Sequence, residues 1–179
     1  MNFRGISLAD LAARICDHCR SLGIEVVLSG GACVSIYSQN RYLSYDLDFV
    51  LLESMGRRRL KAAMLPLGFK DEGRYFRHPD TPFLVEFLSP PLSVGQEPVR
   101  EILDMRRGKA TLRLLSQTDC VKDRLAAFYH WNDRQSLDQA ILVCRDAEVD
   151  LAEVERWSIA EGMKSGFRFF KKELEEADV

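Results

Sequence analysis

Residues 28–52, LSGGACVSIYSQNRYLSYDLDFVLL, set two glycines and two aspartates between two apolar runs. The short apolar run at residues 24–28 predicts a strand that the glycine pair ends. Residues 32–37 are predicted to form a short helix, residues 40–45 a polar loop, and residues 46–52 a second strand. The stretch therefore predicts a strand–helix–strand unit whose second strand begins with Asp46 and Asp48.

Three carboxylates are candidate metal ligands. Asp46 and Asp48 are separated by one residue, so in a strand both side chains point to the same face and repel each other. Oxygen ligands of this kind suit Mg²⁺ or Mn²⁺. Glu86 interrupts the apolar run FLVEFL at residues 83–88, where burying a lone carboxylate is costly. If the two strands are neighbours, the three acids could hold a pair of metal ions.

The glycine pair supplies a candidate anion site. Gly30 and Gly31 follow a strand and open a helix, so the backbone can come close to a ligand and the helix can offer free N–H groups. Ser29 adds a hydroxyl to this pocket. Ser44 either caps the turn before the second strand or contacts a phosphate.

Composition and charge leave most partners open. The 179 residues are 46% hydrophobic and 29% charged, with a net charge of −2, so neither a nucleic-acid nor a membrane partner is required. No apolar stretch reaches the roughly 18 residues that a membrane span needs. The N-terminal residues do not resemble a secretory signal, and five cysteines do not make a disulfide framework. We therefore expect a cytoplasmic protein.

The pattern of elements predicts an α/β (α+β) fold, with a mixed-sheet core at residues 1–116 and a helical subdomain at residues 117–179. Helices are predicted at 8–21, with Ser7 as the N-cap, and at 54–65. Strands are predicted within 69–77 and at 83–88, followed by a hairpin that turns at 106–109 into a strand at 110–115. Further helices are predicted up to residue 131, with Thr118 or Asp119 as the cap, at 134–145, and beyond 151. Phe128 and Trp131 are predicted to pack between these helices.

Cys16, His18 and Cys19 form a C-x-x-C group with a histidine, which can bind zinc. No second ligand pair follows at short range. The same residues lie in a helical apolar pattern, which favours Cys19 as a small core residue.

The sequence resembles the nucleotidyltransferase superfamily, which has the DNA polymerase β-like fold. The resemblance lies in LSGGACVSIYS, LSYDLDFVL and FLVEF, and covers roughly residues 24–145. The stretch from residue 119 to 143 is also similar to the helical region of bacterial AbiEii-type, toxin-like nucleotidyltransferases. There Lys122, Arg134 and Asp138 match the motif, whereas Gln135 stands where the family often has aspartate.

The resemblance implies a division of labour among these residues. Asp46 and Asp48 would bind a metal that bridges the nucleotide phosphates, and Glu86 would hold a second metal and help to activate the attacking hydroxyl. Ser29, Gly30 and Gly31 would position the β- and γ-phosphates, with Ser44 beside them, and Lys122 would neutralise triphosphate charge. The implied cofactor is Mg²⁺ or Mn²⁺, and the implied substrate is a nucleoside triphosphate.

Plainer interpretations of the same residues remain open. The two aspartates could face solvent, and Glu86 could lie on an edge strand facing water. Lys122 could belong to a solvated helix face. Arg134 and Asp138 have the i,i+4 spacing of a helix salt bridge. The basic run at residues 57–59 suits either a solvated helix face or a nucleic-acid contact.

Three functions fit the sequence. The first is a metal-dependent nucleotidyltransferase acting on an RNA end, a protein or a small hydroxylated molecule. The second is a non-catalytic binding or regulatory protein of the same fold, as one half of a toxin–antitoxin or phage-defence pair with an antitoxin-like partner. The third is an interaction protein whose helical tail binds a partner.

Overall fold

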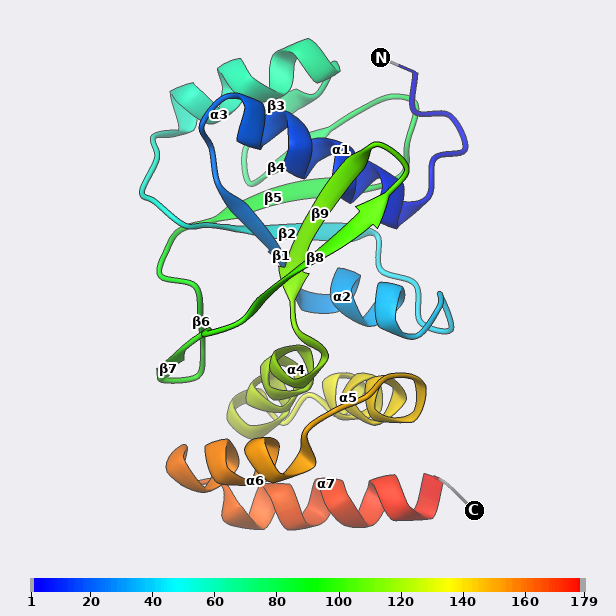
Figure 1. Ribbon diagram of the computed structural model, residues 1–179, viewed down its shortest axis with the longest axis vertical. Helices are drawn as coiled ribbons and strands as arrows, with labels where there is room; N and C mark the ends of the chain where they lie inside the picture. Colours follow the sequence, from blue (N-terminus) through cyan, green and yellow to red (C-terminus); the bar gives the residue numbers. More distant parts are fainter. Residues whose placement is uncertain (1, 178–179) are drawn as a thin grey trace.

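The computed structural model of the protein describes residues 2–177, and its centre is a mixed sheet of seven strands (Figure 1). The strand order is β3-β4-β5-β2-β1-β9-β8. The strands are β1 (Val26–Ser29), β2 (Asp46–Leu51), β3 (Lys70–Glu72), β4 (Tyr75–Arg77), β5 (Leu84–Leu88), β8 (Ile102–Arg107) and β9 (Ala110–Leu115). The predicted α/β fold class is confirmed. Residues 1, 178 and 179, which the two predicted parts include, lie outside the described residues.

The glycine pair opens a helix, as the sequence predicts. α1 (Leu8–Ser21) is capped by the Ser7 side chain, as the sequence predicts, and β1 then leads directly into α2 (Gly30–Tyr37). The glycines belong to the helix, so the predicted range 32–37 begins two residues too late. Gly30 can start the helix because its φ of +67° is open to glycine at little cost.

The middle of the chain adds one half of the sheet. α3 (Arg57–Met64) begins after Gly56, so the predicted start at residue 54 is wrong, and η1 (Leu65–Leu67) ends at the left-handed Gly68. β3 and β4 form a hairpin around Gly73, and β4 pairs antiparallel with β5. β5 then lies parallel to β2. The expectation that the strand carrying Glu86 neighbours the strand carrying the two aspartates is confirmed.

The other half of the sheet is built from the predicted hairpin. β8 and β9 pair antiparallel, and β9 runs parallel to β1. A two-stranded hairpin of β6 (Ser93–Val94) and β7 (Glu97–Pro98), which the sequence did not predict, precedes them. The end of β9 passes into α4 (Gln117–Trp131), capped by the Ser116 hydroxyl, so the predicted cap at residue 118 or 119 is wrong.

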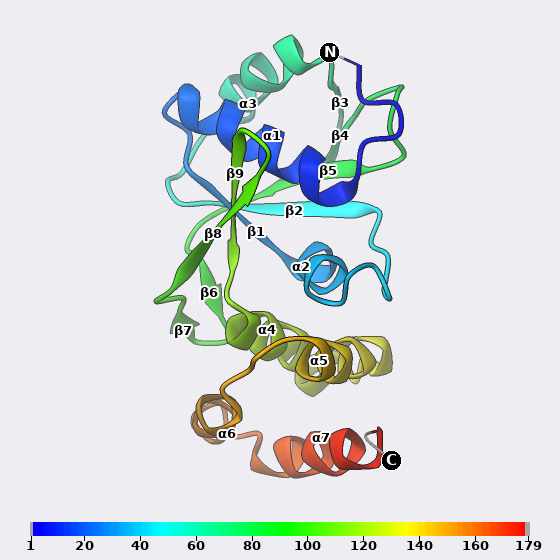
Figure 2. The same cartoon turned by 45° about the vertical axis from the view of Figure 1, so that its right-hand side comes forward.

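The helices of the C-terminal part lie below the sheet in two layers (Figures 1 and 2). α4 and α5 (Arg134–Asp146) lie nearest to the sheet, and α2 packs against both. α6 (Leu151–Ala160) and α7 (Lys164–Ala177) form the second layer. Phe128 stacks on Phe169 of α7, as predicted, but the Trp131 side chain is 76% exposed. Trp131 is the last residue of α4, so the prediction that it packs between helices is wrong.

One hydrophobic cluster joins the sheet to the helices, from Phe3 to Leu174. Cys16 and Cys19 of α1 are buried in it, and burial raises the pKa of both thiols to about 12. The interpretation of Cys19 as a core residue is confirmed. His18 places its Nε2 2.7 Å from the carbonyl oxygen of Ala63. Over residues 2–177, no helix combines the length and the apolar composition that crossing a membrane requires.

Candidate active site

Two predicted site carboxylates lie side by side on neighbouring strands. The parallel register of β2 and β5 sets Asp48 opposite Glu86. Along β2 the buried residue Leu47 alternates with the exposed Asp46 and the half-buried Asp48. Because alternate strand residues share a face, the two aspartates point away from the side that Leu47 occupies. The acids are thus grouped by strand pairing.

The start of α2 completes one side of this group. β1 pairs antiparallel with β2 and places Ser29 opposite Asp48, so the next residue, Gly30, lies against the Asp48 carboxylate. A Cβ atom on Gly30 would be 2.6 Å from Asp48 Oδ2. No side chain caps α2, so its first N–H groups lack the partner that capping residues give α1, α4, α5 and α6. Such a terminus favours an anion.

The two serines of the predicted site hold its backbone. Ser29 Oγ donates to the carbonyl oxygen of Asp48 at 3.2 Å. Ser44 Oγ donates to the carbonyl of Asp46 at 3.0 Å and accepts the N–H of Asp46 at 3.2 Å. Ser44 also lies 3.3 Å from the position that a Cβ on Gly31 would take. Of the two roles proposed for Ser44, these hydrogen bonds show the turn cap. The cap lies next to the glycine pair.

Negative charge is concentrated around Asp48. The pKa of Asp48 is raised to about 6, chiefly by burial and then by the neighbouring carboxylates of Glu86 and Asp46. The positive charge of Arg124 opposes this shift. A crowded carboxylate group of this kind is stabilised by a bound cation. The donor set is therefore chemically suited to Mg²⁺ or Mn²⁺.

Glu86, however, already has a cationic partner. Arg74 Nε lies 2.7 Å from both carboxylate oxygens of Glu86. The Glu86 side chain is 9% exposed, whereas the Arg74 side chain is 68% exposed. Within residues 2–177, no cluster of three His, Cys, Asp or Glu side chains is arranged to hold a metal ion. The carboxylate oxygens of Asp46, Asp48 and Glu86 are of the chemical type that binds a divalent cation, and Glu86 is paired with Arg74.

α4 brings two further charged residues to this site. Asp123 raises and Arg124 lowers the pKa of Asp48 through their charges, so both lie within electrostatic range of it. Arg124 donates to Asp123 Oδ2 from two nitrogens, at 3.1 and 2.5 Å, and to Gln139 Oε1 at 3.3 Å. Sequence reasoning singled out Lys122 and missed its two neighbours. The charged run KDR at residues 122–124 was the available signal.

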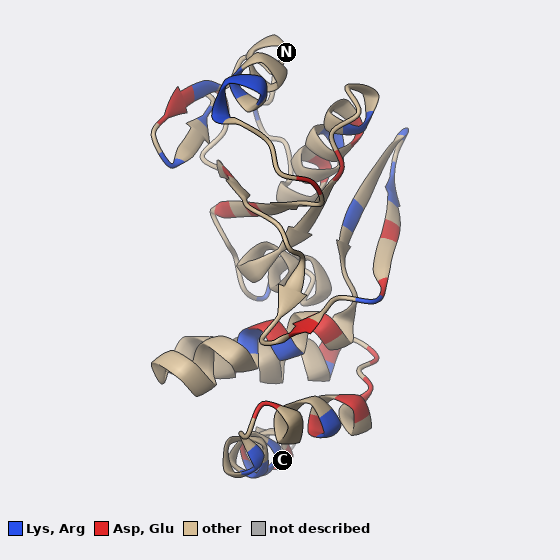
Figure 3. Cartoon of the chain, turned by 90° about the vertical axis from the view of Figure 1, so that its left-hand side faces the viewer, with Lys and Arg blue, Asp and Glu red and all other residues tan. Residues whose placement is uncertain are grey.

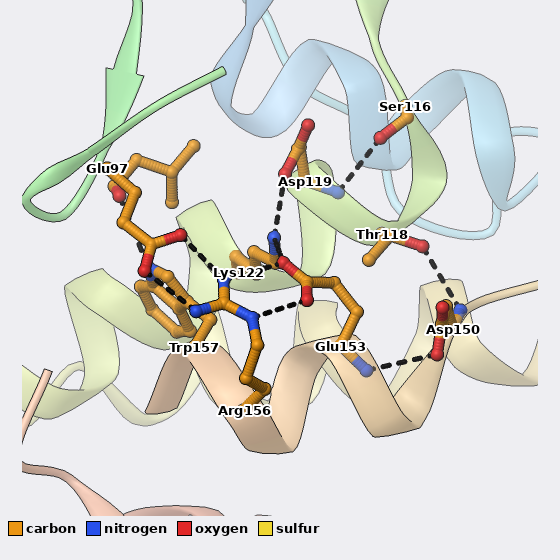
Figure 4. Close-up of polar contacts among 10 residues, drawn as sticks. Glu97, Ser116, Thr118, Asp119, Lys122, Asp150, Glu153, Arg156 and Trp157 are labelled. Carbon is orange, nitrogen blue, oxygen red and sulfur yellow. Dashed lines mark hydrogen bonds and ion pairs between the residues drawn. The ribbon is translucent and has the colours of Figure 1, made fainter. Parts of the chain in front are cut away.

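Lys122 contacts a different set of carboxylates (Figure 4). It is buried, with 6% of its surface exposed, and its ammonium group lies 3.2 Å from Asp119 Oδ1 and 2.7 Å from Glu153 Oε1. These residues line a cavity of about 210 Å³ between α4, α6 and the β7–β8 segment. The residues lining this cavity do not include Asp46, Asp48 or Glu86. The structure thus does not place Lys122 among the three acids, and its nucleotide-binding role stays a prediction.

An ion-pair network joins two residues that line the Lys122 cavity, Glu97 and Glu153. Arg156 of α6 donates to Glu153 and, through two nitrogens at 3.0 and 2.6 Å, to Glu97 of β7. The Arg156 guanidinium and then Lys122 lower the pKa of Glu153 to about 2. Trp157 Nε1 donates to the carbonyl of Val94 at 3.2 Å. These contacts bind the β6–β7 hairpin to α6.

The second predicted motif lies on α5. Arg134 pairs with Glu173 of α7 at 3.4 Å, and its guanidinium lies 5.1 Å from the centre of the Phe169 ring. Asp138 is exposed. Arg134 thus contacts α7, and the functional role of the Arg134–Asp138 motif stays a prediction.

Similarity to known proteins is found at the level of structure. No protein-family model and no curated protein matches the chain. A crystal structure of an antigenic nucleotidyltransferase-like protein from Paracoccidioides brasiliensis is 14% identical, with a TM-score of 0.57, over 92% of this chain and 94% of that one. The solution structure of the antibiotic-resistance factor ANT(2'')-Ia is 13% identical, with a TM-score of 0.52, over 96% of both chains.

A crystal structure of ANT(2'')-Ia in complex with adenylyl-2''-tobramycin is 15% identical, with a TM-score of 0.50, over 93% of this chain and 97% of that one. At these identities the similarity concerns the fold. The seven-stranded mixed sheet, the flanking helices and these neighbours together show that the chain has a nucleotidyltransferase fold.

Proposed function

We propose that the protein is a metal-dependent nucleotidyltransferase, which transfers a nucleoside monophosphate from a nucleoside triphosphate to an acceptor hydroxyl. One observation carries the proposal: Asp48 lies opposite Glu86 on parallel strands and directly against Gly30 at the start of α2. Carboxylates that suit a divalent cation therefore adjoin a helix terminus that suits a phosphate. The shared fold of the structural neighbours supports the same reaction class.

Each residue has a proposed task. Asp46, Asp48 and Glu86 would hold Mg²⁺ or Mn²⁺, which when bound neutralises phosphate charge and stabilises the entering and leaving oxygens. Gly30 and Gly31 would offer backbone N–H groups to the phosphates. Glu86, on the neighbouring strand, would accept the proton of the acceptor hydroxyl as it attacks the α-phosphate and pyrophosphate leaves.

Ser29 and Ser44 would act by fixing the strand ends that carry the two aspartates, since both hydroxyls bond to those backbones. Lys122 would reach a phosphate only after leaving Asp119 and Glu153. Its role is therefore tested separately from that of the three acids.

The acceptor class also belongs to the proposal. The sequence leaves an RNA end, a protein and a small hydroxylated molecule open. The crystal structure of ANT(2'')-Ia contains adenylyl-2''-tobramycin, a nucleotidylated small molecule, and this favours the third class for the present chain. No observation in residues 2–177 favours an antitoxin-like partner.

The test is calorimetric titration of ATP, GTP, CTP and UTP into the protein with and without Mg²⁺. The Asp46→Ala, Asp48→Ala double variant is compared with Asp17→Ala, which removes an exposed carboxylate of α1. We expect Mg²⁺-dependent binding that the double variant loses and Asp17→Ala keeps. Incubation with α-labelled nucleotide and separate RNA, protein and aminoglycoside pools then identifies the acceptor. Absence of binding and of label transfer would favour a non-catalytic protein.

A further inference from the structure

Arg74 lies in the turn of the β3–β4 hairpin, and its side chain extends to Glu86. Antiparallel pairing sets Tyr75 of β4 opposite Glu86 of β5, so the preceding residue, Arg74, is next to the carboxylate. Its Nε lies 2.7 Å from both Glu86 oxygens. The charge of Arg74 is also within electrostatic range of Asp48. Arg74 therefore supplies positive charge at the group of carboxylates where a divalent cation is proposed to bind.

The backbone of this turn is fixed independently of the Arg74 side chain. Arg57 of α3 donates to the carbonyl oxygens of Gly73 and Arg74, the latter at 3.4 Å, and pairs with Asp71 of β3. Its guanidinium also lies 4.2 Å from the centre of the Phe76 ring. Figure 3 shows basic residues at the start of α3 and on the hairpin beside it. The hairpin can thus keep its place when the Arg74 side chain moves.

The two ends of the Arg74–Glu86 pair differ in their freedom. Glu86 is buried on a central strand, whereas the Arg74 side chain is 68% exposed. The exposed partner can rotate into solvent when a metal ion bound beside Glu86 replaces its charge, because the buried carboxylate then stays paired with a cation. The Glu86 carboxylate is fixed by its strand, so only its cationic partner, Arg74, can be exchanged for another cation.

We propose that Arg74 is an internal counter-ion of the site, which neutralises Glu86 until a divalent metal and nucleotide bind and then pairs with a nucleotide phosphate. The inference rests on the proposed function. Arginine suits both positions, because its planar guanidinium binds carboxylate and phosphate through the same parallel N–H groups. The exchange keeps both Glu86 and the incoming phosphate paired with a cation.

The test measures Mn²⁺ binding to the nucleotide-free protein, by titration with detection of free Mn²⁺ through its paramagnetic resonance signal. Arg74→Ala is expected to bind Mn²⁺ about fivefold more tightly than wild type, because Arg74 no longer competes with Mn²⁺ for the Glu86 carboxylate. The same variant should bind the Mg²⁺ complex of the preferred nucleotide about fivefold more weakly, because one phosphate contact is lost. Arg77→Ala, which removes an arginine paired with Glu72 on the same hairpin, should change neither affinity.

Arg74→Gln, which keeps most of the side-chain volume, serves as the second variant if Arg74→Ala has an altered melting profile. The proposal is overturned if wild type and both Arg74 variants bind Mn²⁺ equally, or if nucleotide affinity does not fall. If wild type and the Arg74 variants bind Mn²⁺ equally and Asp48→Ala abolishes the binding, the exchange of Arg74 is rejected and the proposed function stands. Absence of Mn²⁺ and nucleotide binding in every protein would reject both.

Discussion

Asp48 and Glu86 are separated by 38 positions in the chain yet lie opposite each other on parallel strands β2 and β5. Arg74 holds Glu86 from one side, and Gly30 lies against Asp48 from the other. This pair is the centre of the candidate active site, because the register of two neighbouring strands fixes its geometry. The following predictions test the contacts around the pair and the helices below it.

Gly30→Ala is expected to destabilise the protein and displace the Asp48 carboxylate. The φ of +67° costs a residue with a Cβ about 1–2 kcal/mol, and the new Cβ would lie 2.6 Å from Asp48 Oδ2. Chemical denaturation measures the loss, and Mg²⁺-dependent nucleotide binding measures the effect on the site.

Gly31→Ala is the matched control. A Cβ atom on Gly31 would lie 3.3 Å from the hydroxyl oxygens of Ser44 and Tyr42, and the φ of Gly31 is not in the left-handed region. We expect its stability to stay within about 1 kcal/mol of wild type, since alanine favours a helix. Equal losses in both variants would contradict the close approach of Gly30 to Asp48.

Asp48→Asn is expected to stabilise the metal-free protein at neutral pH. The pKa of Asp48 is raised from 3.8 to about 6 in the folded state, so folding favours the protonated carboxyl. The wild type thus loses stability as the pH rises from about 4 through 6, and the asparagine variant avoids this loss. We expect a gain of about 1–2 kcal/mol at pH 7.5 that disappears near pH 4.

Thermal melts in a chelator at several pH values between 4 and 7.5 measure this difference. Asp17→Asn, at an exposed position of α1, is the control and should show no such trend. A gain that is the same at every pH would show that ionisation of the buried Asp48 carboxyl is not its cause.

Glu153→Gln is expected to weaken the network of the Lys122 cavity. The Glu153 carboxylate accepts hydrogen bonds from Lys122 at 2.7 Å and Arg156 at 2.6 Å, which lower its pKa from 4.5 to about 2. This stability is present above pH 4.5 and is lost as the pH falls toward 2. Because the side chains of Arg156 and Glu153 are 49% and 33% exposed, we expect a loss of about 1 kcal/mol at pH 7 that shrinks between pH 5 and 3.

Glu155→Gln, in the same helix but exposed, is the matched comparison. Urea denaturation of both variants at pH 7 and pH 3.5 separates the network from a general effect of charge. If Glu155→Gln loses as much stability as Glu153→Gln, the network is not the source.

Ser116→Ala is expected to cost about 1 kcal/mol, because its hydroxyl accepts the N–H of Asp119 at 3.1 Å and caps α4. Ser116→Thr keeps the hydroxyl and should retain most of this stability. Denaturation curves of the two variants test the cap. A loss in Ser116→Thr as large as in Ser116→Ala would point to packing instead, since Ser116 is buried.

Local sequence patterns account for the elements but not for the boundaries of all of them. The strand preceding the glycines, the D-x-D strand, the hairpin at β8–β9 and the Ser7 cap follow from periodicity and turn chemistry within short windows. The starts of α2, α3 and α4 were misplaced. In α4, for example, Ser116, Thr118 and Asp119 are all residue types that cap helices, and the structure uses the Ser116 hydroxyl.

By itself the sequence singled out Asp46, Asp48 and Glu86 as candidate site residues, because these carboxylates lie in otherwise apolar strands where charge is costly. Only the tertiary structure decided that β5 lies parallel to β2 in the register that pairs Asp48 with Glu86. It also brought Arg74 and Arg124 to these acids and directed Lys122 to Asp119 and Glu153. Strand order and helix docking depend on contacts between distant residues, which no local period encodes.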